Sequence, residues 1–435
     1  MAFTTVQGSG GAPDSFVGTS GVDSIVIVNS SGNYFLGAQP SNDVILLNTT
    51  SSPLYDGTVS TVTMRGGQGN DSFTWTSAEP TTYNNAFFNG NGEDDVFSFD
   101  DGDSFLATTA QGGQGDDTFN GATADFAASL INGNKGDDTL TFVGAISASS
   151  IFGGQGDDTI TLGFSGNDIT NSVIDGALGD DEITVADAAF TTKSLDNSSF
   201  LGGAGDDSID LSDAGATDDI VFVDGNEGDD EIFGTERGDA SLFGGEGSDT
   251  ISSETVSGPA SITFVGGEGA DTLSGDTQSV DRFFYTEFGQ GSASVAATNG
   301  TTVLVGDTIT SFSGGDKVGI STSLLSGSSP AAAAVSTDWN LSTTGAGVLT
   351  SGATALAGVT TASQIASLIN TVGVTGDAGD IAYAVIFDGT AANASLLVQV
   401  ELGSAASDRA LNKDDSIALL GRFDRDLVAG NVEFG

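Results

Sequence analysis

A glycine-rich loop that ends in aspartate is repeated ten times between Gly66 and Leu273, and it limits the chain to a small set of folds. One clear copy reads GGQGDDTI at 153–160, and another reads GGAGDDSI at 202–209. Each copy carries glycine at its fourth position, aspartate at its sixth and an apolar residue at its eighth. The glycine indicates a turn with positive φ or a close backbone approach, and the apolar residue indicates a short strand with one side chain pointing inward.

The repeat assigns one residue to each of these positions in every copy. The fourth-position glycines are Gly69, Gly92, Gly115, Gly136, Gly156, Gly179, Gly205, Gly228, Gly247 and Gly269. The sixth-position aspartates are Asp71, Asp94, Asp117, Asp138, Asp158, Asp181, Asp207, Asp230, Asp249 and Asp271. The apolar residues are Phe73, Val96, Phe119, Leu140, Ile160, Ile183, Ile209, Ile232, Ile251 and Leu273. Nine copies also begin with glycine, at Gly66, Gly112, Gly133, Gly153, Gly176, Gly202, Gly225, Gly244 and Gly266.

The spacing of the repeat predicts how the copies are arranged. Successive aspartates lie 19 to 26 residues apart, and nine steps cover the 200 residues from Asp71 to Asp271. A repeat of about 22 residues is too short to bury its own core, so neighbouring copies must stack and pair strand with strand. The sequence therefore predicts an all-β fold, a parallel β-solenoid of about 22 residues per coil.

We expect three parts in the chain. Residues 1–65 carry a weaker form of the signal, with Asp14 and Asp23 nine residues apart, and are predicted to be degenerate coils that cap the solenoid. Residues 66–280 form the repeat itself. Residues 281–435 are predicted to be a β-rich cap or assembly region, with one helix over 361–372 and strands over 381–400.

The loops fit the pattern GGxGxDxU and resemble the calcium-binding nonapeptide of RTX (repeats-in-toxin) proteins, the hemolysin-type calcium-binding repeat. Segments 281–285 and 306–318 resemble the part of serralysin-type secreted proteins that closes the β-roll and leads to the export signal. The family's β-roll carries two nonapeptides per coil, whereas this chain has one good loop followed by a variable segment, such as 163–171 or 186–199. We therefore expect one calcium-rich edge and an opposite edge of irregular loops.

Ligand chemistry also points to multiple Ca²⁺ ions, because hard cations prefer oxygen and these loops offer carbonyls and a carboxylate. The fifth position adds a second acid in seven copies, at Glu93, Asp116, Asp137, Asp157, Asp180, Asp206 and Asp229. Like charges stacked about 4.8 Å apart repel one another unless a cation lies between them. The open alternative is a metal-free solenoid whose glycines and aspartates only make turns.

Composition excludes several classes of protein. With 60 acidic and 10 basic residues the formal charge is −50, which excludes nucleic acid as a partner and couples cation binding to folding. The absence of histidine and cysteine excludes an HExxH zinc site, a Ser-His-Asp triad and disulfides. The basic residues of the repeat region and just beyond are scattered, so we predict no enzyme activity.

The localisation expected is extracellular or at the cell surface. No membrane-spanning segment and no cleavable signal peptide is visible, and such a repeat protein resembles type I secretion substrates, in which the export signal is C-terminal. The tail 424–434 looks like the endings of those proteins, although a terminal strand that caps the fold is the other interpretation.

The leading hypothesis is a secreted calcium-dependent structural protein that assembles with itself, as a surface-layer (S-layer) subunit or an extracellular matrix filament, since RTX surface-layer proteins are a branch of the family it resembles. Cell-surface polysaccharide is a further possible partner. The alternative is a monomeric adhesin or carbohydrate-binding module that uses the variable loops. Trp75 and Tyr83 would suit sugar stacking there, although core packing is the other use for such residues.

Overall fold

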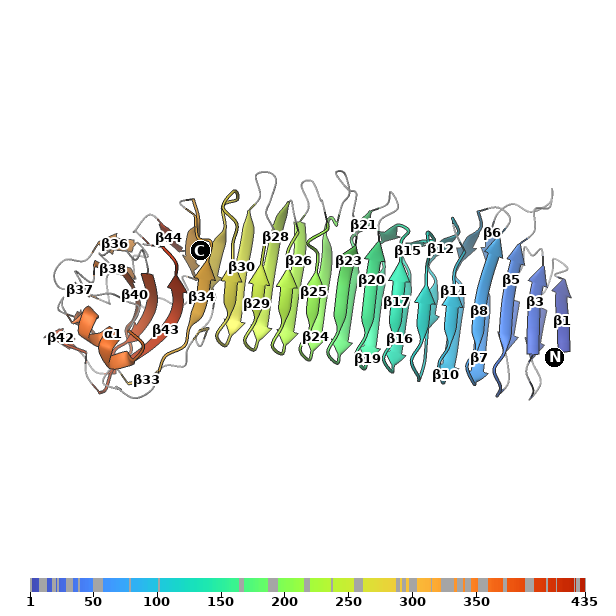
Figure 1. Cartoon of the computed structure of the whole chain (residues 1–435), viewed down its shortest axis with the longest axis horizontal. Coiled ribbons are helices and arrows are strands. Elements are labelled where there is room, and N and C mark those ends of the chain that lie inside the picture. Colours follow the sequence, from blue (N-terminus) through green and yellow to red (C-terminus); the bar gives the residue numbers. More distant parts are fainter. Residues whose placement is uncertain are drawn as a thin grey trace. The chain divides into compact units, whose positions relative to one another are not determined.

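The computed structural model is nearly all β and contains a parallel β-solenoid with about 23 residues per turn (Figure 1). It describes residues 2–7, 14–17, 21, 23–28, 34–37, 40–49, 58–77, 80–100, 102–163, 168–186, 195–214, 220–235, 238–253, 261–286, 290–291, 295–296, 303–313, 315–321, 332–334, 339–340, 346–350, 359–370, 374–387, 395–403, 406–411, 413–425, 427 and 431–434. The chain divides into two compact units. The first is Met1–Glu227 with Thr235–Gly238, and the second is Gly228–Gly234 with Asp239–Gly435.

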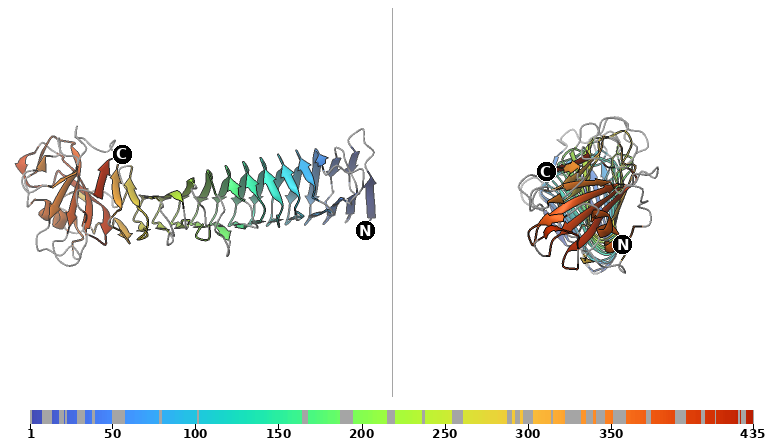
Figure 2. Two further views of the ribbon diagram at one scale, coloured as in Figure 1. Left: turned by 90° about the horizontal axis from the view of Figure 1, so that it is seen from above. Right: turned by 90° about the vertical axis from the view of Figure 1, so that its left-hand side faces the viewer.

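Each coil of the first unit contributes one strand before the glycine-rich loop and one after it. The pre-loop sheet contains β2 (Asp14–Val17), β4 (Tyr34–Gly37), β7 (Val62–Gln68), β10 (Phe87–Gly92), β13 (Thr109–Gln111), β16 (Leu130–Lys135), β19 (Ser150–Gln155), β22 (Val173–Leu178), β24 (Ser198–Ala204) and β26 (Ile220–Glu227). The post-loop sheet contains β1 (Ala2–Gln7), β3 (Asp23–Val28), β5 (Val44–Thr49), β8 (Ser72–Ser77), β11 (Val96–Ser98), β14 (Thr118–Asn120), β17 (Thr139–Phe142), β20 (Thr159–Gly163), β23 (Glu182–Ala186) and β25 (Ser208–Asp210). Strands pair in parallel with their equivalents one coil along, and the successive strands of the first unit, blue to green, lie side by side in Figure 2. For example, β10 pairs with β7 and β11 pairs with β8.

A third sheet of short strands lies within the segments that we expected to be irregular. It contains β6 (Thr58–Ser60), β9 (Thr82–Asn84), β12 (Ser104–Leu106), β15 (Asp125–Ala127), β18 (Ile146–Ser147) and β21 (Ile169–Thr170), all paired in parallel. These strands form because each buries one large apolar side chain. Tyr83, Phe105, Phe126, Ile146 and Ile169 are all at most 1% exposed. The coils that contain them therefore have three faces.

Aromatic side chains stack from coil to coil in the core of the first unit. Phe73, Phe97 and Phe119 stack with ring centroids 4.6 and 4.5 Å apart, which matches the spacing of paired strands. Trp75 and Tyr83 also lie in this core, at 2% and 0% exposure, and Tyr83 stacks on Phe105. The idea that these two rings offer a sugar-stacking surface is therefore wrong.

The second unit contains further coils and a β-rich C-terminal region. Its coil strands are β27 (Glu231–Phe233), β28 (Asp239–Glu246), β29 (Thr250–Ser252), β30 (Ile262–Glu268), β31 (Thr272–Ser274), β32 (Arg282–Tyr285), β34 (Asp307–Thr310) and β35 (Lys317–Ile320). β32 pairs in parallel with β30, and β34 pairs with β31. Parallel coiling thus continues past residue 280, where the loop motif stops.

The rest of the second unit contains one helix, as predicted, and further strands. Helix α1 (Ala362–Ile369) buries Ile365 and Ile369 against apolar residues of the neighbouring strands. The strands are β33 (Val295–Ala296), β36 (Ala332–Ala334), β37 (Trp339–Asn340), β38 (Ala346–Thr350), β39 (Val374–Gly376), β40 (Ile381–Phe387), β41 (Ser395–Glu401), β42 (Ala406–Arg409), β43 (Ser416–Phe423) and β44 (Val432–Phe434). The terminal strand β44 pairs with β35. No helix in the described ranges has the length and apolar character needed to cross a membrane.

Candidate functional site

Strand pairing fixes which residues of successive loops are equivalent. Val96 pairs with Ser72 and Phe97 pairs with Phe73, so the residue equivalent to Asp71 is Asp95. Asp95 is 0% exposed, whereas its neighbour Asp94 lies on the surface. The second copy of the repeat is therefore shifted by one residue from the predicted alignment.

This shift corrects the sequence-based assignments of the second copy. Glu93 has the positive φ, 68°, that we expected of Gly92, and Asp95 takes the position given to Asp94. Phe97 occupies the core position given to Val96, which is 40% exposed. The physical reason is the aromatic stack, because only Phe97 can lie between the rings of the coils on either side. In the other nine copies the fourth-position glycine has positive φ as predicted.

The sixth-position aspartates form a hydrogen-bonded ladder that we call the buried ladder. The backbone N–H of Asp71 donates to Oδ1 of Asp95 at 2.7 Å, and the N–H of Asp95 donates to Oδ1 of Asp117 at 2.7 Å. The same bond continues through Asp138, Asp158, Asp181 and Asp207 in the first unit, and it joins Asp230, Asp249, Asp271 and Asp307 in the second. Each carboxylate thus satisfies a backbone donor of the preceding coil.

The second carboxylate oxygen of the ladder is enclosed by the loop. In seven of these residues Oδ2 has no hydrogen-bond partner in the part of the chain that the structure describes: Asp71, Asp95, Asp117, Asp138, Asp158, Asp181 and Asp249. A methyl group on Gly133 would lie 2.0 Å from Oδ2 of Asp138 and 2.6 Å from the carbonyl oxygen of Gly153 in the next coil. First-position glycine is therefore required, because any side chain would occupy the space between these two oxygens.

Burial makes the ladder carboxyls hard to ionise. Desolvation raises the pKa values of Asp95, Asp117, Asp138 and Asp158 from 3.8 to about 8, and neighbouring acids add to the shift while the backbone hydrogen bond opposes it. The same causes raise the pKa of Asp71 and of Asp249 to about 7. A bound cation at Oδ2 would favour the ionised form instead.

The fifth-position acids form a second, exposed ladder on the surface of the loops, in which Asp94 takes the position given to Glu93 because of the same one-residue shift. The N–H of Asp116 donates to Oδ1 of Asp94 at 3.1 Å, and the N–H of Asp137 donates to Oδ1 of Asp116 at 3.0 Å. Here the donor belongs to the later coil, whereas in the buried ladder it belongs to the earlier one. Asp157, Asp180 and Asp206 continue the exposed ladder. Two columns of carboxylates therefore run along one edge of the first unit.

Oxygen atoms of both ladders and of the backbone lie close together around each loop. A methyl group on Gly136 would lie 2.1 Å from the carbonyl oxygen of Gly115 and 2.9 Å from Oδ1 of Asp116. In the described ranges no three acidic side chains converge on one point. The backbone carbonyl and carboxylate oxygens around such a loop are an oxygen donor set of the kind Ca²⁺ takes. The residues present fit the ion that the sequence suggests.

Two members of the buried ladder, Asp95 and Asp307, were missed by the sequence pattern, whereas a third, Asp43, lies twenty residues after Asp23 and belongs to the weaker N-terminal form of the signal. The pattern assigned the sixth position of the second copy to Asp94, the acidic neighbour of Asp95. Asp43 donates its N–H to Oδ1 of Asp71 at 2.7 Å, and Oδ1 of Asp307 accepts the N–H of Asp271 at 3.2 Å. The signal for Asp307 is Asp307-Thr308-Ile309, an aspartate followed two residues later by a buried apolar side chain, without glycine at the first and fourth positions of the loop.

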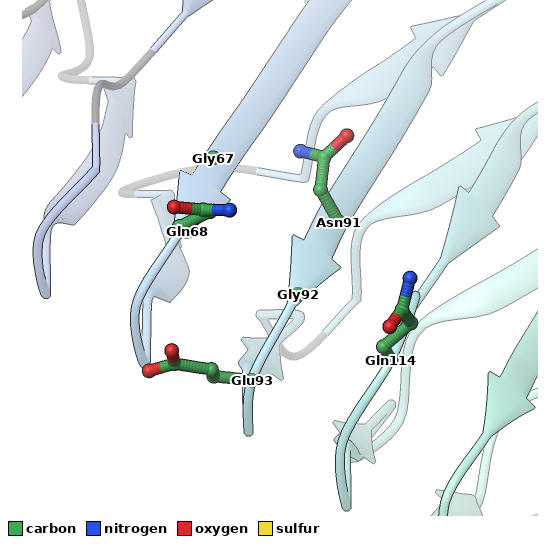
Figure 3. Close-up of a pocket in the computed structure, with 6 residues that line it drawn as sticks. All are labelled: Gly67, Gln68, Asn91, Gly92, Glu93 and Gln114. Atoms are coloured by element: carbon green, nitrogen blue, oxygen red, sulfur yellow. The ribbon is translucent and has the colours of Figure 1, made fainter.

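A groove lined by amide side chains lies beside the loops of the first unit. One hollow is lined by Gly67, Gln68, Asn91, Gly92, Glu93 and Gln114 (Figure 3). A second hollow shares Asn91 and Gln114 and adds Asn89, Gln111, Gly113, Asn134 and Lys135. We call these two hollows together the amide groove. It crosses β7, β10, β13 and β16, and no sequence motif marks it.

No protein-family model matches the chain, and no curated protein sequence matches it significantly. The buried aspartate ladder and the parallel coils are compatible with an RTX β-roll.

Proposed function

We propose that the chain is a secreted, calcium-dependent structural protein related to the RTX β-rolls, and that it assembles with itself at the cell surface. The observation that carries this proposal is the buried ladder, in which enclosed carboxylate oxygens recur in coil after coil. The ladder supports a role for calcium because each enclosed Oδ2 lies beside a glycine of its loop. Backbone carbonyls of that loop can supply the other oxygen ligands that a hard cation needs.

In this proposal the ions are held by carbonyls of the first- and fourth-position glycines and by the sixth-position aspartates, with Glu93 and Asp95 replacing Gly92 and Asp94 in the second coil. Calcium would neutralise acids in a chain of formal charge −50 and so permit close contact between copies. A surface-layer subunit or a matrix filament is the assembly we expect. No catalytic role is proposed.

Assembly is tested by sedimentation velocity and negative-stain microscopy on the full chain at high concentration. We expect ordered sheets or filaments in millimolar Ca²⁺ and none in chelator or in equal Mg²⁺, because Mg²⁺ gives up its water ligands reluctantly. A protein that remains monomeric in millimolar Ca²⁺ contradicts the structural role.

A monomeric carbohydrate-binding module is the second candidate. The amide groove is the observation that favours it, in place of the aromatic residues that we first considered.

A further inference from the structure

We infer that the end of the solenoid formed by β1 and β2 joins the same end of a second copy of the chain, head to head, by pairing of edge strands. The inference rests on the proposed self-assembly and deepens it, because it names one contact of the assembly and the surface that makes it. It concerns the first unit alone.

The two long sheets of the first unit each have an edge strand at this end. β1 pairs with β3 and β2 pairs with β4, and in the described ranges neither strand has a paired strand on its other side. Figure 1 shows β1 at the end of the row of strands, next to β3. The outer side of an edge strand carries backbone N–H and C=O groups that can pair with another chain.

The sequence of β1 lacks the features that block pairing at a sheet edge. Its six residues, AFTTVQ, include no charged residue, proline or glycine. They pair with β3 in one continuous register, so no bulge turns the edge away. In β2 the apolar Val17 is 57% exposed. Such an edge favours addition of a further strand.

This end also carries little charge, although the chain is strongly acidic. Residues 1–40 contain two of the 60 acidic residues and none of the 10 basic ones. The exposed ladder continues here through amides, because the N–H of Asn70 donates to Oδ1 of Asn42 at 3.2 Å, as the N–H of Asp116 does to Asp94. Two copies of formal charge −50 can therefore meet at this end with little local repulsion.

A second copy fits this end better than an extended peptide does. A peptide pairs with one edge only, whereas a copy related by a twofold axis presents both edges at once. Each coil rises by about one strand spacing, about 4.8 Å, so β1 stands further out along the solenoid than β2. A twofold axis parallel to the strands then places β1 of each copy against β2 of the other, and both sheets continue across the contact.

The chain contains no cysteine, so introduced thiols report this contact. Strand register places Thr5 in one column with Thr74, and Ser15 in one column with Thr63. The variant Thr5→Cys/Ser15→Cys puts one thiol on each edge strand. The matched control, Thr74→Cys/Thr63→Cys, puts thiols in the same two columns but in coils away from the edge.

We expect disulfide-linked dimers of the edge variant, and at least about tenfold fewer of the control, when the full chains are oxidised in millimolar Ca²⁺ and run on non-reducing gels. Equal cross-linking of the two variants overturns the inference. So does an edge variant that forms no dimer but cross-links to a cysteine-bearing peptide of the β3 sequence, because the edge would then take a single strand and not a second copy.

A charge variant tests the same contact without a covalent bond. Thr5→Glu/Ser15→Glu places like charges on both edges and should weaken association at least about tenfold in sedimentation velocity, whereas Thr74→Glu/Thr63→Glu should leave it unchanged. Far-ultraviolet circular dichroism checks that both variants fold. Unchanged association of the edge variant overturns the inference even where sheets or filaments form. Edge-linked dimers without sheets or filaments support the inference and contradict the larger assembly, so the two failures are distinguishable.

Discussion

At the scale of single residues, the sixth-position aspartate has two separate tasks. Its Oδ1 accepts a backbone N–H of the preceding coil, and its Oδ2 lies enclosed beside a glycine. A turn-making role needs only the first task, whereas calcium binding needs the second. Substitutions that keep one oxygen and replace the other therefore distinguish the two roles.

Asp138→Asn keeps an oxygen for the N–H of Asp117 and places an NH₂ group near the carbonyl of Gly153. Without calcium at pH 8 we expect the variant to be more stable than the natural chain by about 1 kcal/mol, because a buried charge is removed. In calcium we expect it to be less stable, because a ligand is lost. Urea unfolding in both conditions measures this, with Asp125→Asn as the control, because Oδ1 of Asp125 accepts the N–H of Ala145 outside both ladders. A loss of equal size in both conditions would mean that the aspartate only makes the turn.

The raised pKa values predict an unusual pH dependence for the calcium-free protein. Because the folded-state pKa of Asp95, Asp117, Asp138 and Asp158 is about 8 and the ordinary value is 3.8, their contribution to stability is fully present below pH 4 and is lost as pH rises through 8. We expect the urea midpoint in chelator to fall between pH 6 and pH 8, a range in which ordinary carboxylates do not titrate. Calcium should abolish the fall. A urea midpoint that does not change with pH in chelator contradicts the burial of these carboxyls.

Glycine substitutions test the register of the second loop. Gly115 has φ of 115°, and a methyl group there would lie 2.5 Å from the backbone of Glu93, so Gly115→Ala should cost about 2 kcal/mol or more of the free energy of unfolding. At Gly92 the nearest atom to an added methyl group is 4.0 Å away, so Gly92→Ala should change stability by less than about 0.5 kcal/mol. Thermal unfolding of the two variants measures the two losses of stability. Equal losses would mean that Gly92, and not Glu93, occupies the fourth position of the second loop.

At the scale of strands and loops, the coils are held in register by side-chain columns as well as by backbone pairing. The Phe73, Phe97 and Phe119 rings lie parallel, with interplanar angles of 3°. Such a column stabilises one alignment of neighbouring coils, because a shift of one residue would turn each ring toward solvent.

Phe97→Ala should therefore cost about 3–5 kcal/mol, the usual penalty for removing a buried phenylalanine ring. Val96→Ala is the matched control, since Val96 is 40% exposed, and we expect a change below about 0.5 kcal/mol. Chemical denaturation measures both. If Val96→Ala proves the more damaging change, the assigned register of this coil is wrong.

The same elements show what the sequence could and could not predict. The solenoid, the single helix and nine of the ten loops follow from local spacing, because each loop repeats its own turn chemistry. The second loop does not, since Glu93, Asp94 and Asp95 are all acidic and the choice between Val96 and Phe97 depends on rings in other coils. The third sheet was missed because strands of two or three residues, such as Ile146–Ser147, are too short to show a period.

At the scale of the whole molecule, the formal charge of −50 is the main obstacle to compaction. The solenoid concentrates many of these charges in two adjacent columns. Without a counterion, the buried carboxyls either ionise and repel one another or stay protonated because their pKa values are raised. Bound divalent ions would remove the repulsion and favour the ionised form. Folding and calcium binding are therefore expected to be one coupled process.

The most direct test of this claim is a calcium titration of the chelated full chain at pH 8, followed by far-ultraviolet circular dichroism, with magnesium as the control. We predict a weaker β-signal and a lower urea midpoint in chelator than in calcium, a cooperative rise in both as calcium reaches about 10⁻⁴ to 10⁻³ M, and little response to magnesium. A chain that shows the full β-signal in chelator at pH 8 and does not respond to calcium would contradict the account, and the loops would then be turns alone.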